Sequence, residues 1–557
     1  MNIKIKTLPK EVINLIAAGE VIDSLAAVVR ELAENSIDAG ANRIHISILP
    51  ESWLVRVTDN GHGMNLSDLK MAALPHTTSK INKVQDLGKI TSLGFRGEAL
   101  HSIATLADLE IISSVDEGYK ISYNSGGEVK KETNAAIAKG TIVTVSNLFG
   151  NWSGKRAGIT SVNQQLKAVQ NVIYQIALCH PHITWILTQN EKKWLNISPG
   201  KTAKDILIQI IKEINLTDLQ CFTLPVTEQE EDCQIKVVLG LPDRCHRHRP
   251  DWIKVAVNGR MIKSPELEQI IITAFSRTLP RDRYPICLIH LQISPEQIDW
   301  TRQPSKSEIF LQNLSFWQGK ITEAIHQTLN FNPESLSETT HNQRVGNILK
   351  VAEEKAGYNS KRNLPEINNK KSEIGLVELK AIAQLHHTYI VAEHPKGIWL
   401  IEQHIAHERV LYEQLCDRWQ IVPLETAIIL QNLTPNRVEQ LQRIGLEIDV
   451  FGVNLWAVRT IPAMLKHRED CTDALLELSL GGDLQTAQVA IACRSAIRNG
   501  TVLTLTQMQT LISQWQSTNN PRTCPHGRPI FLSLEESSLS RFFRRHWVIG
   551  KSHGLNN

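Results

Sequence analysis

A polar stretch in the middle of the chain constrains the fold more than any other feature. Residues 333–373 are rich in Asn, Ser, Lys and Glu and poor in bulky apolar side chains. Such a segment cannot bury enough apolar surface to offset the entropy lost on folding, so we expect a flexible linker. The 557-residue chain must then fold as separate bodies on either side of it. At roughly 100–200 residues per domain, three or four domains are expected.

The residue patterns on both sides of this stretch favour an α/β multidomain protein. Helical spacing over residues 11–37, with an expected break at Gly19, precedes two alternating strand patterns. Such an order of helices and strands is typical of layered α/β structure. A second α/β unit is expected over 200–330, with a helix near 264–276. The expected strands are 42–49, 53–58, 235–240, 253–257, 285–293, 389–392 and 397–401.

The net charge and the cysteine content exclude few classes of protein, whereas the hydropathy pattern argues against a membrane-spanning or secreted protein. The 60 basic and 57 acidic side chains give a net charge of +3, which neither demands nor excludes a nucleic acid partner. The nine scattered cysteines fit reduced thiols better than a secreted disulfide framework. No run of eighteen apolar residues and no signal peptide is present, so we expect a cytoplasmic protein without a membrane partner.

Two motifs near the start point to nucleotide chemistry. Glu31 and Asn35 are four residues apart and share one face of the expected helix. A carboxylate there can orient a water, and an amide oxygen can hold magnesium. Asp59 follows a strand and precedes Gly61 and Gly63, which allow close approach of backbone to a ligand. Taken alone, the first motif could be a solvated helix face and the second an ordinary turn.

Two further motifs supply the surroundings of a phosphate. The run 76–80 (His-Thr-Thr-Ser-Lys) is followed by Gly94 and Gly97, which open an expected helix whose free N–H groups suit phosphate oxygens. The polar stretch between them fits a mobile lid. A Gly-Thr turn at 140–141 enters a strand. No GxxxxGK[ST] pattern is present, which disfavours a P-loop enzyme.

Together these motifs resemble the GHKL ATPase module shared by gyrase, heat-shock protein ninety, histidine kinases and MutL. The residues 16–21 (Ile-Ala-Ala-Gly-Glu-Val) and 94–100 (Gly-Phe-Arg-Gly-Glu-Ala-Leu) are similar to the MutL family of DNA mismatch repair proteins. The resemblance implies an α/β sandwich with ATP under a lid, Glu31 as general base, Asn35 as magnesium ligand and Asp59 as adenine reader. The other nucleotide-binding residues that it implies are Asp38, Gly61, Gly63, Thr78, Ser79, Lys80, Gly94, Arg96, Gly97 and Thr141.

The second domain continues the resemblance. Residues 257–260 (Val-Asn-Gly-Arg) match a family element, and 298–306 align with a segment whose final lysine, Lys306 here, would reach the γ-phosphate. The chain departs from the family at Gln303 and over 148–156. Basic residues could hold double-stranded DNA through its phosphates without reading sequence, or could be ordinary solvated charges. They are Lys155, Arg156, Arg260, Arg277, Arg281 and Arg283.

The last part of the chain carries possible metal ligands. His404 and Glu408 share one helical face, and Cys524 and His526 lie in the sequence Cys-Pro-His-Gly-Arg-Pro. Such residues are more often ordinary surface groups. These motifs and Cys493, however, resemble the branch of the MutL family whose C-terminal domain nicks DNA. That resemblance implies Zn²⁺ or Mn²⁺ held by Glu402, His404, Glu408, Cys493, Cys524 and His526, with Glu402 at a catalytic position. The chain departs from this branch at Glu402 (usually Asp) and Ile405 (usually Ala).

The sequence therefore predicts four regions. They are an ATPase domain (1–200), a transducer domain (201–332), a linker (333–373) and a C-terminal dimerisation and endonuclease domain (374–557). By resemblance, the chain is an ATP- and Mg²⁺-dependent homodimer that connects a MutS-type mismatch-recognition protein to strand removal. A sliding-clamp contact is implied at 418–423. The alternatives are a non-nicking matchmaker whose C-terminal metal is structural, and a gyrase-type topoisomerase, which is disfavoured because no DNA-cleavage module for it is recognisable downstream.

Overall fold

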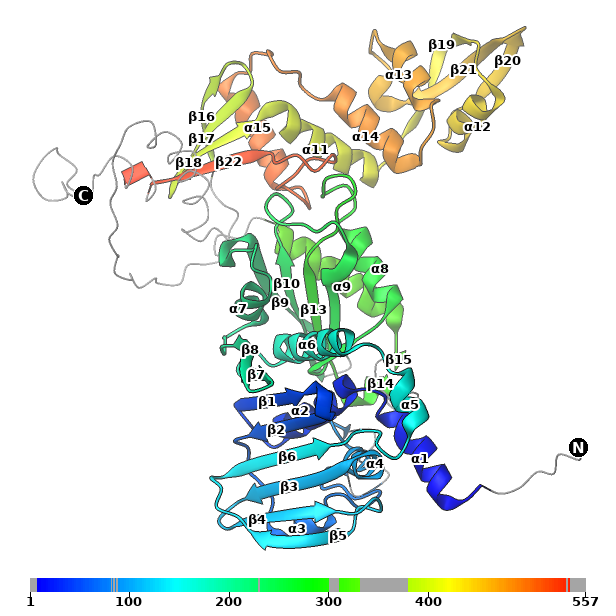
Figure 1. Cartoon of the computed structure of the whole chain (residues 1–557). Helices are drawn as coiled ribbons and strands as arrows, with labels where there is room; N and C mark the ends of the chain where they lie inside the picture. Colours follow the sequence, from blue (N-terminus) through cyan, green and yellow to red (C-terminus); the bar gives the residue numbers. More distant parts are fainter. Residues whose placement is uncertain are drawn as a thin grey trace, which may run out of the picture.

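The computed structural model describes residues 8–81, 83, 86, 89–228, 231–299, 310–330, 379–536 and 539–540. Three bodies follow one another in space, with the first sheet at one end, the second in the middle and the C-terminal elements at the other end (Figure 1). The α/β multidomain class is confirmed. The predicted linker, 333–373, lies outside the described residues.

An eight-stranded sheet forms the first body, in the order β5-β4-β3-β6-β2-β1-β7-β8. Its core contains Val28 and Leu32 of a helix packed against Ile46 and Val57 of the sheet. The strands are β1 Arg43–Leu49, β2 Leu54–Asp59, β3 Asp108–Ser114, β4 Gly118–Tyr123, β5 Val129–Asn134, β6 Gly140–Ser146, β7 Thr184–Gln189 and β8 Lys192–Ile197. The helices around it are α1 Lys10–Val21, α2 Leu25–Asp38, α3 Leu66–Met71, α4 Ala99–Leu106, α5 Ser153–Gly158, α6 Val162–Cys179 and α7 Ala203–Ile210.

The helix break predicted at Gly19 is wrong. Helix α1 continues through Gly19 to Val21, and α2 starts after Ser24, whose side chain accepts a hydrogen bond from the Ala27 N–H. That N-cap, not the glycine, fixes where the second helix begins. A Cβ at position 19 would lie 2.7 Å from the Trp152 ring, so the glycine allows close packing inside the helix.

A five-stranded sheet, in the order β12-β11-β13-β10-β9, forms the transducer body. Its strand β11 is parallel to β13 and antiparallel to β12, and two helices, α8 and α9, pack beside it (Figure 1). The strands are β9 Leu219–Glu228, β10 Glu231–Gly240, β11 Ile253–Val257, β12 Arg260–Ile262 and β13 Cys287–Gln292, with a small pair formed by β14 Ile298–Asp299 and β15 Phe310–Leu311. The helices are α8 Pro265–Ala274 and α9 Leu314–Leu329.

The C-terminal body contains two separate sheets. One is ordered β16-β17-β18-β22 and the other β19-β21-β20. The strands are β16 Lys380–Leu385, β17 Tyr389–His394, β18 Gly397–Glu402, β19 Ile421–Gln431, β20 Ile448–Gly452, β21 Leu455–Pro462 and β22 Phe531–Glu535. The helices are α11 Gln403–Asp417, α12 Pro435–Arg443, α13 Cys471–Leu478, α14 Leu484–Ser495 and α15 Leu505–Gln516. Helix α11 packs against both α14 and α15 and so joins the two halves.

Among the described residues, no single helix is long and apolar enough to cross a membrane. By length and composition alone, the helices Glu11–Val21 and Leu25–Asp38 together would suffice, but they are bent by 78°.

Candidate ATP-binding and metal sites

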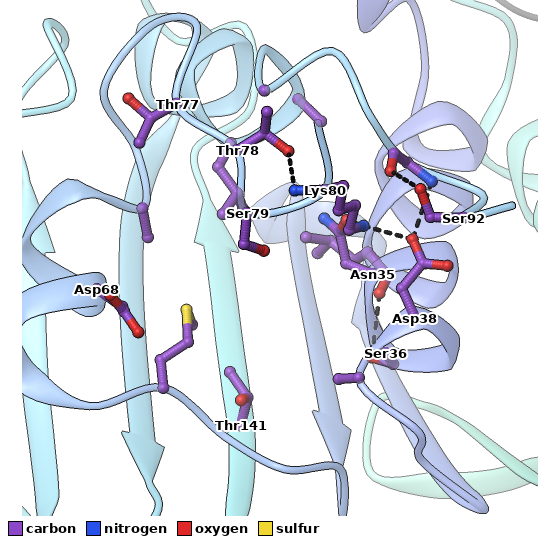
Figure 2. Close-up of a pocket in the computed structure, with 18 of the residues that line it drawn as sticks. Asn35, Ser36, Asp38, Asp68, Thr77, Thr78, Ser79, Lys80, Ser92 and Thr141 are labelled. Atoms are coloured by element: carbon purple, nitrogen blue, oxygen red, sulfur yellow. Dashed lines mark hydrogen bonds and ion pairs between the residues drawn. The ribbon is translucent and has the colours of Figure 1, made fainter. Parts of the chain in front are cut away.

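A cavity of about 1060 Å³ opens between α2, the first sheet and the 77–80 loop. Figure 2 shows Asn35 and Asp38 on α2 at one side, Thr77 to Lys80 on the loop, and Asp68 and Thr141 across from α2. All but one of the predicted nucleotide-binding residues of the first domain line this cavity. They are Glu31, Asn35, Asp38, Asp59, Gly63, Thr78, Ser79, Lys80, Gly94, Arg96, Gly97 and Thr141.

Asp59 at the end of β2 is held in one orientation. Its Oδ2 accepts a 2.9 Å hydrogen bond from the Ser36 hydroxyl, and its Oδ1 accepts a 2.9 Å hydrogen bond from the Gly61 N–H. Burial raises the pKa of the Asp59 carboxyl, although these hydrogen bonds oppose the rise. A carboxyl fixed in this way can accept from an exocyclic amino group, such as that of adenine.

Gly61 is the residue that differs from the prediction, because it does not line the cavity. A Cβ there would lie 2.7 Å from the Ala39 carbonyl oxygen and 3.1 Å from Asp59 Oδ1, so this glycine serves the close packing behind Asp59. Gly63 does line the cavity. Its φ is +76°, and a Cβ there would lie 2.0 Å from the Ser114 carbonyl oxygen, so this position requires glycine.

Asp38 holds the backbone turn at Leu93 and Gly94. Its two carboxylate oxygens accept hydrogen bonds from the Leu93 and Gly94 N–H groups, both at 2.9 Å. The Lys80 ammonium forms an ion pair with the same carboxylate and lies 3.3 Å from Asn35 Oδ1. Lys80 and Asn35 therefore meet at the cavity wall and offer a cation and an amide oxygen, groups that suit phosphate oxygens and a magnesium ion.

The phosphate end of the cavity is shaped by the turn before α4. Gly97 has a φ of +65°, and a Cβ there would approach the Thr77 backbone to 2.6–2.8 Å. The N-terminus of α4 is thereby pressed against the 77–79 loop, which leaves its first N–H groups near the cavity.

Sequence reasoning missed several lining residues. Ser36 orients Asp59, while Asn65 and Asp68 line the far wall. Asn65 caps α3 through a 2.9 Å hydrogen bond from the Asp68 N–H, a pattern that a search for helix caps could have found. Nothing in the sequence indicated the role of Ser36, because this residue on α2 comes within hydrogen-bonding distance of Asp59 only when the helix packs on the sheet.

The candidate DNA contacts are partly overturned. Arg260 is buried and bonded to Glu34 and to the Leu93 carbonyl, so it cannot reach DNA in this arrangement. Lys155 donates to the Gly19 carbonyl at 2.6 Å and lies over the Trp152 ring, within the 148–156 segment that departs from the family. Arg277 donates to Thr486. Lys306, the predicted γ-phosphate contact, lies outside the described residues.

In the C-terminal body, three predicted metal ligands converge. One ligand atom each from Glu408, Cys524 and His526 lie within 4.8 Å of one another. Glu408 is fully buried on α11, and its carboxylate lies 2.7 Å from His526 Nδ1. The structure thus brings together two motifs that are more than a hundred residues apart in the chain.

His404 and Cys493 extend this cluster. His404 Nε2 lies 3.9 Å from the Cys493 sulfur, and His404 Nδ1 lies 3.0 Å from the Ile497 carbonyl oxygen. Burial, followed by the negative charge of Glu408, raises the pKa of the Cys493 thiol. A histidine whose other nitrogen is fixed by a carbonyl is typical of metal-binding proteins.

Two cations neutralise the centre of the cluster. Arg528 Nη2 lies 2.8 Å from Glu408 Oε2, and Arg528 Nε lies 3.5 Å from the Cys524 sulfur. Hydrogen bonds to Cys524 and then to Glu408 raise the pKa of His526 to about 9. Burial disfavours ionised Cys524, but hydrogen bonds with His526 and Arg528 outweigh it and lower the pKa of the thiol.

Glu402 is not one of the three residues whose ligand atoms converge. It is the N-cap residue of α11, and its Oε2 accepts a 2.5 Å hydrogen bond from the Ile405 N–H. One carboxylate oxygen of Glu402 therefore caps the helix. The second oxygen, Oε1, is buried and has no hydrogen-bond partner among the described residues, so the metal-binding role of Glu402 stays a prediction.

Comparisons with known proteins identify the domains in which the two candidate sites lie. Residues 23–148 match the family described as histidine kinase-, DNA gyrase B- and HSP90-like ATPase. Residues 211–330 match the DNA mismatch repair protein C-terminal domain, and 382–503 match the MutL C-terminal dimerisation domain. Fold and cavity thus define an ATPase of the GHKL class joined to a dimerisation domain.

Relatives that match over nearly their whole length identify the family within this class of ATPases. The DNA mismatch repair protein MutL of Rippkaea orientalis is 60% identical, with 100% of each chain covered. That of Nostoc punctiforme is 59% identical, with 99% of each chain covered, and that of Methanoculleus marisnigri is 32% identical over 97% of this chain and 100% of its own. The chain belongs to the MutL family of DNA mismatch repair proteins.

Proposed function

We propose that this chain is an ATP-gated homodimer that links recognition of a mismatch by a MutS-type protein to removal of the faulty strand, with metal-dependent nicking of DNA at its C-terminal cluster. The observation that carries the nicking proposal is the convergence of Glu408, Cys524 and His526. With an ATP cavity and a candidate metal-ligand set in one chain, nucleotide binding would be joined to phosphodiester chemistry.

In the ATP cavity, different residues would contact the adenine, the magnesium ion, the phosphates and the attacking water. Asp59, oriented by Ser36 and Gly61, would accept from adenine. Asn35 would hold magnesium, and Lys80 would move from Asp38 toward phosphate oxygens. Glu31, one helical turn before Asn35 on α2, would orient and deprotonate the attacking water.

The C-terminal cluster fits a divalent metal. One carboxylate, one thiol and one imidazole, supplemented by His404 and Cys493, are the donors that zinc prefers, and manganese accepts several of them. A bound ion would polarise a DNA phosphodiester or a water beside it. The chain's own part is to fix the ligands: α11 presents Glu408, and the turn at Gly527, with a φ of +78°, brings Cys524 and His526 to the same side.

A nicking assay tests this proposal. The full-length protein should convert supercoiled DNA to the open circle with Mn²⁺ and ATP, and should retain metal after dialysis. Cys524→Ser combined with His526→Ala should lose both metal and nicking while ATP hydrolysis continues. Cys416→Ser with His467→Ala, which lie outside the cluster, is the matched control. Absence of metal and of nicking in the parent protein would refute the nuclease proposal.

A second candidate function is a non-nicking matchmaker in which the metal is structural. Glu402 favours it, because this residue caps α11 where the nicking branch has an aspartate near the metal. In that case the parent protein should hold metal and fail to nick. Loss of the metal should then lower the thermal stability of the C-terminal body without any change in DNA.

Dimerisation is supported by the sheet of β16, β17, β18 and β22. One face packs on α11 and α15 through Ile390, Trp399 and Ile401. On the other face, register places Val391 opposite Leu400, and Leu400 opposite Leu532. Ile398 and Tyr389 on that face are 39% and 44% exposed. A partly exposed row of apolar side chains suits a second copy of the chain.

The N-terminal helix α1 supports ATP-dependent closure. Its apolar residues Val12, Ile13 and Ile16 are 39–46% exposed. Because α1 lies close to the lid-bearing helix α4, a change around the nucleotide can alter how this stripe is presented. We propose that it joins a second N-terminal domain when ATP is bound.

We propose contacts with DNA and with a sliding clamp from the exposure of a few residues. Arg281 is exposed on the transducer domain and Arg283 is partly exposed, and both could meet phosphates. The segment 418–423 leaves α11, and its Ile421 and Val422 pair with β21. Clamp binding there would use Arg418, Gln420 and Pro423, which are exposed.

A further inference from the structure

The transducer domain and the C-terminal body touch through a compact polar contact. On one side is the segment 276–280, which follows α8 and is called the transducer turn below. On the other side is the docking face, defined by Arg409 on α11, the start of α14 and the loop 522–527. In Figure 1 the loops at the end of the transducer sheet reach toward α11 and α14.

Backbone recognition forms the centre of this contact. Arg409 Nη2 donates to the Arg277 carbonyl at 2.7 Å, while Arg409 Nε donates to the Thr523 carbonyl at 2.7 Å. The Thr523 hydroxyl donates to the Thr278 carbonyl at 2.6 Å. Arg409, Thr523 and Thr278 are each at most 1% exposed. One guanidinium therefore bridges the transducer turn and the loop that carries Cys524.

Gly527 completes the fit. A Cβ at this position would lie 2.3 Å from the Pro280 nitrogen and 2.4 Å from the Leu279 carbonyl carbon. The transducer turn thus lies directly on the Cys524–His526 loop, with no room for a side chain between them.

The rim of the contact is made by side chains at the N-terminus of α14. Arg277 Nη2 donates to the Thr486 hydroxyl at 2.8 Å and lies 3.6 Å from Asp483 Oδ1. The Ser276 hydroxyl lies 3.3 Å from Gln485 Oε1. The side chains of the Arg277–Asp483 pair are 31% and 66% exposed, so salt can screen the attraction.

The chemistry of the contact favours reversible docking. Among the described residues, no hydrophobic cluster has members from both bodies: the transducer cluster ends at Leu329 and the two C-terminal clusters begin at Leu379 or later. Arg522 is buried and lies 3.9 Å from Asp243 of the transducer domain. Buried guanidinium groups regain hydration when the bodies separate, whereas the faces of an apolar interface would be left exposed to water.

We propose that the docking face is an interaction surface for the transducer turn of the same chain, and that this reversible contact orders the loop bearing Cys524 and His526. The transducer turn lies just beyond α8, and α8 follows β12, where Arg260 is bonded to the lid carbonyl of Leu93. The N-terminal domain is therefore connected to the C-terminal cluster through consecutive packed elements. This inference goes beyond the proposed function, because it holds whether or not the cluster nicks DNA.

Cysteine cross-linking in the full-length protein tests the contact. Ser276→Cys with Gln485→Cys should form a disulfide on mild oxidation, identified by mass spectrometry of the bridged peptide and by monomer mass on a denaturing gel. Either single substitution alone should not give this bridge. A bridge found only between two chains, or no bridge at all, would overturn the proposal.

Charge reversal tests the rim. Adding Arg277→Glu to the cysteine pair should slow cross-linking about fivefold, since a partly exposed ion pair with a hydrogen bond contributes on that scale. Asp483→Arg added to Arg277→Glu should restore the rate. Arg249→Glu, the same charge change at an exposed arginine elsewhere in the transducer domain, should leave the rate unchanged. Equal slowing by Arg277→Glu and Arg249→Glu would contradict specific docking.

Hydrogen exchange tests the effect on the loop. Arg277→Glu should speed exchange of the Cys524 and Gly527 amides, which donate to the Arg528 and Cys524 carbonyls. It should leave the amides of β20 unaffected. Unchanged exchange at 524–527 would show that docking does not order the loop, and would overturn that half of the proposal.

Discussion

The Arg260 guanidinium lies 2.5 Å from the Glu34 carboxylate, although the two residues are 226 positions apart. Both side chains are less than a tenth exposed, and Arg260 also donates to the Leu93 carbonyl. Glu34 lies on α2 between Glu31 and Asn35. This buried pair therefore joins the transducer domain to the helix and the lid of the ATP cavity.

Breaking that pair should destabilise the N-terminal half strongly. Arg260→Met removes the guanidinium that pairs with the buried Glu34 carboxylate, and breaking such a buried pair is expected to cost about 3–5 kcal/mol. Hydrogen exchange of the α2 amides, measured under native conditions, reports this local loss. Glu439→Gln, which breaks an exposed ion pair with Arg443, should cost less than about 1 kcal/mol. If the α2 amides exchange at the same rate in Arg260→Met and in the parent protein, the Arg260–Glu34 ion pair does not stabilise α2.

Glu31→Ala should bind ATP but hydrolyse it on the order of a hundredfold more slowly, because the water loses its general base. Asn35→Ala should instead weaken binding of magnesium-nucleotide. Steady-state ATP hydrolysis and equilibrium nucleotide binding separate the two effects. Glu51→Ala, an exposed glutamate outside the cavity, is the control. Parent-like turnover in Glu31→Ala would rule out this residue as the base.

Leu400→Asp should prevent dimerisation of the C-terminal bodies. The change places a charge in the middle of the row formed with Val391 and Leu532, where a second copy would have to desolvate it. Light scattering of the full-length protein without nucleotide should report the monomer mass. Val450→Asp, on the exposed part of β20, should leave the dimer intact. A dimeric Leu400→Asp protein would place the interface elsewhere.

Glu402 offers a test of capping against metal binding. Because its carboxylate caps α11, Glu402→Ala should cost about 1 kcal/mol of stability while metal content is kept. Glu402→Asp should keep or raise nicking, since aspartate is the residue of the nicking branch. Metal analysis after dialysis distinguishes the roles, with Cys524→Ser as the reference for a lost ligand. Loss of metal in Glu402→Ala equal to that in Cys524→Ser would restore Glu402 to the ligand set.

The sequence by itself determined the class of fold and predicted most of the polar residues and glycines that the structure brings together around the cavity beside α2. Glu31 and Asn35 share a helical face because four residues make about one turn, and Gly63 and Gly97 are required where the backbone adopts a positive φ. The strands near 253–257 and 285–293 could be predicted because their apolar patterns are local. Where a structural feature depends only on residues close together in the chain, the local sequence pattern was sufficient to predict it.

Only the tertiary structure decided the roles of residues whose partners are distant. Arg260 looked like a DNA contact in the sequence, but folding buries it against Glu34. Nothing in the sequence indicated that Glu402 caps α11, or that Glu408, Cys524 and His526 converge, because both depend on packing. Arg277 of the transducer turn also looked like a DNA contact in the sequence, and Arg409 gave no signal at all. A charged side chain is equally compatible with solvent, a ligand or a buried partner, and the free energy that selects among them comes from burial and from contacts that form only when distant segments pack together.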